Sequence, residues 1–152
     1  MVSRRGSASR VRVLCALVLL ALPGVARAGP DPCKFLTPAQ VAAVLGGTFG
    51  AGEPIGTTGC SWTSAKPHII VTISLWPPAD WDRMKAGGLP GTKIAPESGL
   101  GDDAFYATLA QYTMLYVKKG QSVLLFKVYG VKEQARQASA EKTFALEALK
   151  QL

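Results

Sequence analysis

Three runs of apolar, β-branched and aromatic residues follow one another closely in the C-terminal half of the chain. They span residues 104–109, 112–117 and 122–129, and Gly120 provides the tight turn between the last two. Parallel neighbours in a sheet need a crossover of about a dozen residues or more. Because these connections are far shorter, the sequence predicts consecutive antiparallel strands.

Residues 68–76 (HIIVTISLW) show the alternation of a strand that is buried on one side. The apolar residues on one face of this strand are Ile69, Val71, Ile73 and Leu75. The matching face of the last strand carries Leu124, Phe126 and Val128. We expect both faces to pack against the C-terminal helix, because each strand of a two-layer fold buries one alternate set of side chains.

A short helix is predicted to follow Thr37. Thr37 is a natural N-cap, Pro38 takes the first helical position, and Gln40 completes a capping box. Gly46 and Gly47 then end the helix, as glycines commonly do.

A longer helix is predicted for residues 131–152, and a shorter one for residues 79–86. The residues that recur at helical spacing in the longer one are Ala135, Ala138, Ala145, Leu149 and Leu152. We expect the stripe through Ala138, Ala145 and Leu149 to face the sheet. Residues 89–99, rich in glycine and proline, are expected to form a link. The fold class is therefore α+β: an antiparallel sheet packed on one face by a short N-terminal helix and a long C-terminal helix.

The first 28 residues have the features of a signal peptide that is cleaved after Ala28. An arginine-rich start precedes the apolar run Val13–Leu22, and a small-x-small triplet stands at residues 26–28. The apolar run is shorter than the roughly 20 residues that a membrane-spanning helix needs. The sequence thus predicts a signal peptide, residues 1–28, and one exported domain, residues 29–152, which is periplasmic or secreted.

Two export routes fit this leader. The pair Arg4-Arg5 leaves the twin-arginine route open, but Gly6-Ser7 replaces the apolar residues that usually follow such a pair. General secretion is favoured for that reason. The domain is expected to have no stable membrane anchor after cleavage.

Removal of the leader changes the charge of the protein. The whole chain carries 17 Lys and Arg against 10 Asp and Glu; the leader holds five arginines and no acid, which leaves 12 against 10. A nucleic-acid-binding protein needs a concentrated basic face. The remaining basic residues form no such cluster, so nucleic acid is excluded as a partner.

Cys33 and Cys60 are the cysteines of the exported domain. An exported protein meets an oxidising compartment, so the sequence predicts a disulfide bond between them. A zinc site with His68 as third ligand is the alternative, but the closely spaced cysteine or histidine pairs of zinc sites are missing. No metal and no cofactor are predicted.

The candidate binding residues are Trp76, Pro77, Pro78 and Trp81. Prolines pre-order a backbone and tryptophans supply apolar area with few rotatable bonds, which is the composition of binding hot spots. The hypothesis is an exposed contact surface; the alternative is that both indole rings fold back over the edge of the sheet. Trp62, next to the disulfide, is expected to pack in the core.

Asp102 and Asp103 stand between glycines and an aromatic run. A calcium loop needs more acidic ligands at alternating spacing, and a phosphate site needs glycines that enter a helix. We interpret the pair as a corner that leads into a strand, where an aspartate accepts hydrogen bonds from backbone amides.

Several of these motifs together resemble a family. They are Pro32-Cys33 followed by the Thr37 helix start, Gly59-Cys60-Ser61-Trp62, Gly99 to Phe105, and a hairpin from Tyr116 to Gly120. This combination resembles the actinobacterial DUF3558-type secreted proteins and lipoproteins. The resemblance implies a helix-on-sheet domain with the Cys33–Cys60 disulfide, and no established activity. The chain differs from the lipoprotein members because no cysteine stands at the cleavage site.

Catalysis is not predicted, so we expect the protein not to be an enzyme. His68 is the only histidine, the cysteines are expected to be oxidised, and no Gly-x-Ser-x-Gly motif is present. Sequence alone leaves open whether two carboxylates meet in the fold.

The sequence therefore predicts an exported, non-catalytic binding module that holds a protein partner or a small apolar ligand. It would use the sheet face or the loop of residues 76–88. The alternative is a periplasmic inhibitor or immunity-type protein that blocks a secreted enzyme. A concave apolar cavity would favour ligand binding.

Overall fold

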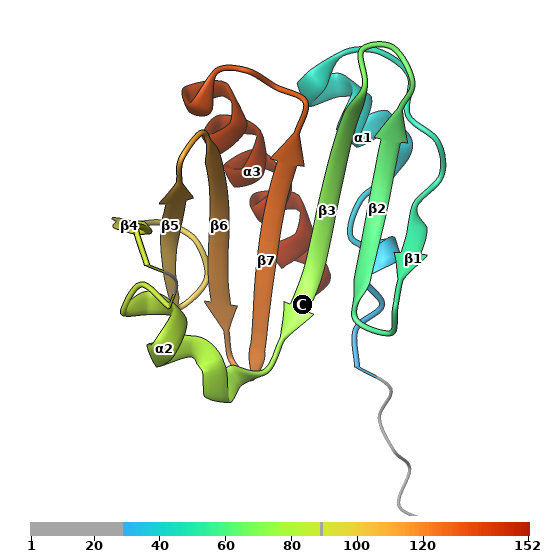
Figure 1. Cartoon of the computed structure of the whole chain (residues 1–152). Coiled ribbons are helices and arrows are strands. Elements are labelled where there is room, and N and C mark those ends of the chain that lie inside the picture. Colours follow the sequence, from blue (N-terminus) through green and yellow to red (C-terminus); the bar gives the residue numbers. More distant parts are fainter. Residues whose placement is uncertain (1–28, 89) are drawn as a thin grey trace, which may run out of the picture.

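The computed structural model describes residues 29–88 and 90–152, so the predicted signal peptide lies outside the described residues. Within these residues, seven strands form one sheet in the order β1-β2-β3-β7-β6-β5-β4 (Figure 1). All neighbouring strands are antiparallel, as predicted. The strands are β1 (Glu53–Ile55), β2 (Gly59–Ser64), β3 (Ile69–Trp76), β4 (Lys93–Glu97), β5 (Asp103–Leu109), β6 (Tyr112–Lys119) and β7 (Ser122–Tyr129).

The sheet joins two meanders, β1–β3 and β4–β7, which meet where β3 pairs with β7. After β3, the chain passes through α2 (Trp81–Lys85) to the far edge of the sheet and returns strand by strand to the centre. Residues 93–97 form β4, although the sequence predicted only a link there. Pro96 is tolerated because β4 is an edge strand, and pairing with β5 supplies the order that its own sequence does not indicate.

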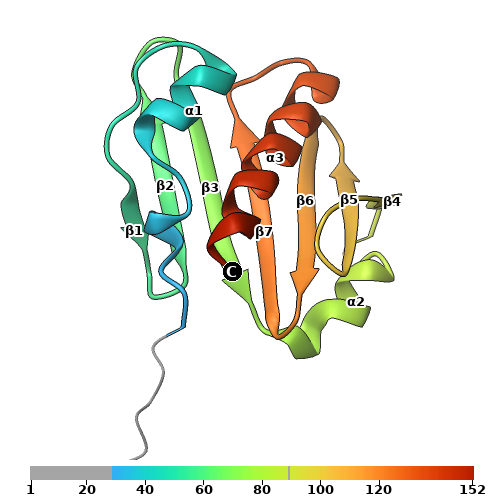
Figure 2. The same ribbon diagram turned by 180° about the vertical axis from the view of Figure 1, so that it is seen from behind.

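The helices α1 (Pro38–Leu45) and α3 (Gln134–Ala148) lie over the same face of the sheet (Figure 2). The capping box of α1 is present: the Gln40 amide donates to Thr37 Oγ1 at 3.3 Å, and the Thr37 amide donates to Gln40 Oε1 at 2.8 Å. Single 3-10 turns form at Pro32–Lys34, Pro78–Asp80 and Leu149–Gln151. The predicted α+β fold class is confirmed.

The main core lies between the sheet and these two helices. The strand residues expected there are buried, except Leu75, which is half-buried against the core: Ile69, Val71, Ile73, Leu124, Phe126 and Val128. Trp62 is also buried, as expected. On α3, Ala145 is buried, and Ala138 and Leu149 are half-buried.

The buried stripe of α3 differs from the predicted one at several positions. Ala135 and Leu152 are exposed, whereas Phe144 and the polar residues Gln137 and Glu141 are buried. The sequence pattern of alanines and leucines identified the helix but did not identify these two polar residues as inward-facing.

Gln137 and Glu141 fill a place where β6 and β7 separate. The last pair of this ladder is Leu115 with Phe126, and two residues further along the same register would bring Thr113 opposite Val128. Instead, the Thr113 amide donates to Gln137 Oε1 at 3.2 Å, and the Val128 amide donates to Glu141 Oε1 at 3.2 Å. Side chains of α3 thus replace strand carbonyls as acceptors at the end of the ladder.

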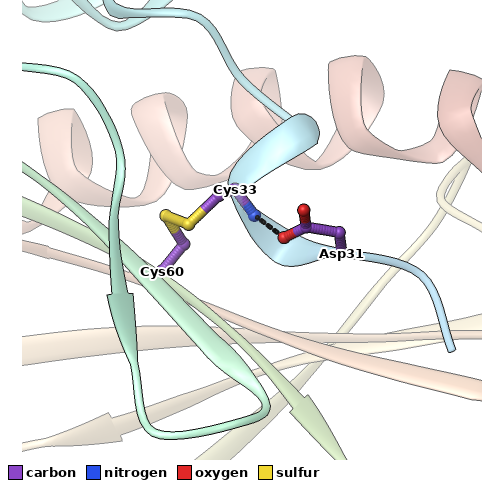
Figure 3. Close-up of a disulfide and its surroundings, with 3 residues drawn as sticks. All are labelled: Asp31, Cys33 and Cys60. Atoms are coloured by element: carbon purple, nitrogen blue, oxygen red, sulfur yellow. Dashed lines mark hydrogen bonds between the residues drawn. A yellow bond between two sulfur atoms is a disulfide. The ribbon is translucent and has the colours of Figure 1, made fainter. Parts of the chain in front are cut away.

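The predicted disulfide is confirmed. Cys33 and Cys60 are joined, with Cα atoms 5.1 Å apart, and the bond attaches the turn before α1 to β2 (Figure 3). Asp31 caps this turn, because its Oδ1 accepts a hydrogen bond from the Cys33 amide at 3.0 Å. The cross-link therefore fixes the entry of the chain into α1 against the sheet.

Candidate functional site

Among the described residues, α2 is the helix that packs on the face of the sheet opposite α1 and α3, and it covers one end of that face. The buried side chains on this face are Trp81, Phe105, Ala107, Tyr116, Val123 and Leu125. Trp76, Met84, Ile94 and Met114 pack against them and are half-buried. The strands β5, β6 and β7 therefore bury both of their faces in this region.

Trp81 belongs to this second core, which corrects the hypothesis that it is exposed. Its side chain is 5% exposed, its ring packs edge-on against Phe105 at 5.1 Å, and its Nε1 donates to Asp103 Oδ2 at 3.3 Å. Phe105 in turn stacks on Tyr116 at 4.9 Å. The physical reason is that the apolar second faces of β5, β6 and β7 need a cover, and α2 supplies it through Trp81.

The other three predicted binding residues remain accessible to different degrees. Trp76 is half-buried and meets Tyr116 edge-on at 6.3 Å between ring centroids, and Pro77 and Pro78 are exposed. Trp76 also lines a hollow beside α2.

Asp103 anchors α2 to the sheet. Lys85 Nζ donates to the same Asp103 oxygen that accepts the Trp81 indole hydrogen. The Lys85 hydrogen bond holds the pKa of Asp103 below its ordinary value, and this outweighs the opposite effect of desolvation. The Asp103 carboxylate therefore serves to hold α2 against the sheet.

Asp102 forms the predicted corner. Its Oδ2 accepts a hydrogen bond from the Gly120 amide at 2.7 Å, and its own amide donates to the Lys118 carbonyl at 2.8 Å. Gly101 precedes it at φ +55°, where a Cβ would collide with that same carbonyl. The structural interpretation of this motif is confirmed.

Two adjoining hollows occupy the part of the face that α2 leaves open. The first has a volume of about 190 Å³ and lies beside α2; it is lined by Trp76, Arg83, Met84, Gly88, Thr92, Ala107, Met114, Tyr116 and Lys127. The second has a volume of about 270 Å³ and is lined by Leu109, Ala110, Tyr112, Thr113, Met114, Lys127 and Tyr129. Because Met114 and Lys127 line both, the two hollows form one shallow feature, which we call the groove.

The strand register explains why these side chains gather. Lys127 of β7 lies opposite Thr72 of β3, and Met114 of β6 lies opposite Ala107 of β5, all on the same face. One step further from α2, Tyr112 and Tyr129 approach each other with ring centroids 5.8 Å apart. The floor of the groove is thus apolar and aromatic, with Lys127 in its middle.

A few polar groups reach the groove. The Thr92 hydroxyl oxygen is buried and has no hydrogen-bond partner among the described residues. Burial raises the pKa of Tyr116 to about 12, so its hydroxyl stays protonated near neutral pH. The Arg83 guanidinium at the rim is paired with Asp80 at 2.9 Å.

Two further hollows adjoin the groove, because Tyr112 lines one of them and Ala110 the other. Their volumes are about 340 and 430 Å³, but glycine, lysine and glutamine residues make up much of their linings. They lack the apolar floor that small-molecule sites usually have. The groove is therefore the better candidate site.

The sequence identified one end of the groove, through Trp76 and the loop of residues 76–88. The lining residues that it did not identify individually include Thr92, Ala107, Met114, Lys127 and Tyr129. One signal was available: residues 123–126 are four consecutive apolar residues, which is typical of a strand that is covered on both faces. That signal points to the second core but not to the open part beside it.

Metal binding has no support in the described part of the chain, where no group of three or more potential ligand side chains comes together. His68 is exposed, at the turn before β3. Within the same residues, no helix is both long enough and apolar enough to cross a membrane.

The chain matches no protein-family model, no curated protein and no solved structure. The resemblance to the DUF3558-type proteins stays a prediction.

Proposed function

We propose that this protein is an exported, non-catalytic binding module that holds a small, largely apolar ligand in the groove. The observation that carries this proposal is the concave apolar floor formed where α2 stops and the sheet face begins to open. Ligand sites usually enclose about 300–1,000 Å³. Each hollow alone lies below this range, so the proposed ligand extends over Met114 and Lys127 and occupies both.

The alternative occupant, a protein partner, finds less support in the surface. Strand addition is disfavoured at both edges of the sheet, because β1 contains Pro54 and β4 contains Pro96. The large exposed hydrophobic residues lie on separate elements: Ile55, Tyr112, Leu146 and Leu152. Such scattered residues are normal on a protein surface and do not mark an interface.

The inhibitor alternative is based, like the binding module, on the size of the domain, its disulfide and its aromatic loop. The burial of Trp81 removes one of the two tryptophans from that contact surface, and among the four predicted residues only Pro77 and Pro78 are exposed. Inhibition of a secreted enzyme therefore stays a prediction from the sequence, and ligand binding is the function we propose.

Export is part of the proposal and is supported by the leader-like sequence of residues 1–28 and by the disulfide bond. Intact-mass analysis of protein recovered outside the cytoplasm is expected to give a chain that begins at Gly29 and carries no lipid. A mass that includes Arg27 or a diacylglycerol group would contradict this.

Titration with a neutral phenylnaphthylamine dye, whose fluorescence rises in apolar surroundings, tests ligand binding. We expect saturable binding that Met114→Glu abolishes, because a carboxylate on the apolar floor makes dye burial costly. Leu146→Glu is the matched control: it makes the same type of change at an exposed position of α3 and should leave dye binding unchanged. Absence of saturable binding, or equal loss in both variants, would overturn the proposed function.

A further inference from the structure

Lys127 stands in the middle of an otherwise uncharged floor. It lies on β7 between Thr72 of β3 and Met114 of β6, is half-buried, and lines both hollows of the groove. The linings of the two hollows contain no aspartate or glutamate among the described residues. No carboxylate in these two linings is therefore available to pair with the ammonium group of Lys127.

Four of the Lys and Arg side chains in the described residues form ion pairs, and Lys127 is among those that do not. The ion pairs among residues 29–88 and 90–152 join Arg83 to Asp80, Lys85 to Asp103, Lys142 to Glu97 and Lys150 to Glu147. Lys127 takes part in none of them. Arg83, the other cation of the groove, is already bound to its own aspartate at the rim.

The Glu141 carboxyl group interacts electrostatically with Lys127 but forms no ion pair with it. Glu141 lies on the other side of β7, where it is 0% exposed and accepts the Val128 amide hydrogen through Oε1. Its Oε2 has no partner among the described residues. Burial raises the pKa of Glu141 to about 8, so this group is mostly uncharged near neutral pH.

We infer that the ligand of the groove is a small amphiphile with one anionic end, which pairs with Lys127 while its apolar part lies along the floor. This inference rests on the proposed function and adds the chemical class of the ligand. An anion placed at Lys127 has an apolar surface on both sides, toward Trp76 and Met84 in one direction and toward Tyr129 in the other. The neutral hydroxyl groups of Thr92 and Tyr116 do not oppose a negative charge.

A matched ligand series separates charge from apolar area. Octanoate, octanol and octylammonium share one alkyl chain and differ in the charge of the end group. Near pH 7, we expect octanoate to displace the neutral dye at about a tenfold lower concentration than octanol, since a hydrogen bond to a charged group contributes on the order of 1.5 kcal/mol. Octylammonium should be the weakest of the three, and added salt should reduce the advantage of octanoate.

Substitution of Lys127 locates the effect. Lys127→Met keeps an apolar stem of similar length, so we expect octanoate to lose its advantage over octanol in this variant, with both ligands measured against the variant's own dye affinity. Lys127→Arg should keep most of that advantage. Lys66→Met removes the same charge from an exposed turn between β2 and β3 and should change nothing.

The outcomes distinguish the inference from the proposed function. If the dye binds but octanoate and octanol compete equally in the wild-type protein, the inference is wrong and the proposed function stands. A preference for octanoate that persists in Lys127→Met also overturns it. If no dye binds the wild-type protein, the proposed function fails first. Should Lys127→Met not fold, the ligand series and the salt titration on the wild-type protein still decide.

Discussion

Trp81 and Trp76 are close in sequence but serve different purposes in the structure. Trp81 is packed on Phe105 and hydrogen-bonded to Asp103, whereas Trp76 is half-buried and lines the groove. One tryptophan therefore contributes mainly to the stability of the second core. The other contributes to the surface on which we propose that ligand binds.

Alanine substitutions at these positions should separate the two roles. We expect Trp81→Ala to lower the free energy of unfolding by about 3–5 kcal/mol, the usual effect of truncating a buried aromatic residue. Trp76→Ala should lower it by less and should weaken dye binding. Chemical denaturation and dye titration measure these effects. A Trp81→Ala variant of nearly wild-type stability would contradict the assignment of Trp81 to the core.

Glu141 makes the stability of the domain depend on pH. Its pKa is raised to about 8 in the folded protein by burial, from an ordinary value near 4.5. Between these values the folded state holds a proton that the unfolded state releases. The free energy of unfolding should therefore fall as pH rises from about 5 to 8, because each step of pH favours the ionised, unfolded form.

Glu141→Gln should remove this part of the pH dependence. Glutamine still accepts the Val128 amide hydrogen but carries no charge, so we expect it to stabilise the protein near pH 8 by an amount on the order of a few kcal/mol. Near pH 5 the two proteins should differ little. Glu147→Gln, on the same helix but at a half-exposed pair with Lys150, is the control. Parallel stability profiles for wild type and Glu141→Gln would refute the assignment.

At the scale of elements, α3 does more than cover the sheet. Where β6 and β7 separate, Gln137 accepts hydrogen bonds from the Thr113 amide and hydroxyl and donates to the Val131 carbonyl. These buried backbone groups have lost the partners that a continued ladder would give them. The side chain of Gln137 on α3 thus supplies hydrogen bonds at the position where the β6–β7 ladder has ended.

Gln137→Ala should be costly for this reason. It leaves a buried amide and a buried carbonyl without partners, and we expect a loss of about 1–3 kcal/mol in the free energy of unfolding. Gln134→Ala, in the first turn of the same helix, removes a hydrogen bond from an exposed side chain and should cost much less. Amide hydrogen exchange at Thr113 should also accelerate in Gln137→Ala. Equal stability of the two variants would show that the hydrogen bonds of the Gln137 side chain do not contribute to the stability of the fold.

At the scale of the whole molecule, the disulfide connects the N-terminal segment to the β1–β3 meander. It joins residues separated by 27 positions, and Cys60 is fully buried beside the main core. The α3 helix holds the other meander, through β6 and β7. The β1–β3 meander and the β4–β7 meander are therefore held together by the β3–β7 pairing and by the main core, to which both contribute side chains.

Removal of the disulfide should destabilise the domain without changing its fold. For a loop of this length, chain-entropy arguments give about 3–4 kcal/mol. We expect Cys33→Ala with Cys60→Ala to lose this amount in denaturant unfolding, and reduced wild-type protein to lose a similar amount. A double variant as stable as the oxidised protein would show that the cross-link does not contribute to stability.

The sequence by itself determined those features that depend on residues a few positions apart. Alternation in residues 68–76, the capping box at Thr37 and the short connections between the last strands were sufficient, because each reports local backbone geometry. The disulfide followed from the number of cysteines and the expected compartment. These features are consistent with one another, so the α+β class could be predicted.

Only the tertiary structure decided the second core, the edge strand β4 and the groove. The pairing of β3 with β7 and the return of the chain from β4 set Lys127 beside Met114 and Trp81 over Phe105. Residues 93–97 become a strand only because β5 offers a partner, and Gln137 and Glu141 turn inward only because two backbone amides need acceptors. These outcomes depend on contacts between residues far apart in the chain, and a local pattern carries no record of which distant groups will lack a partner or a cover.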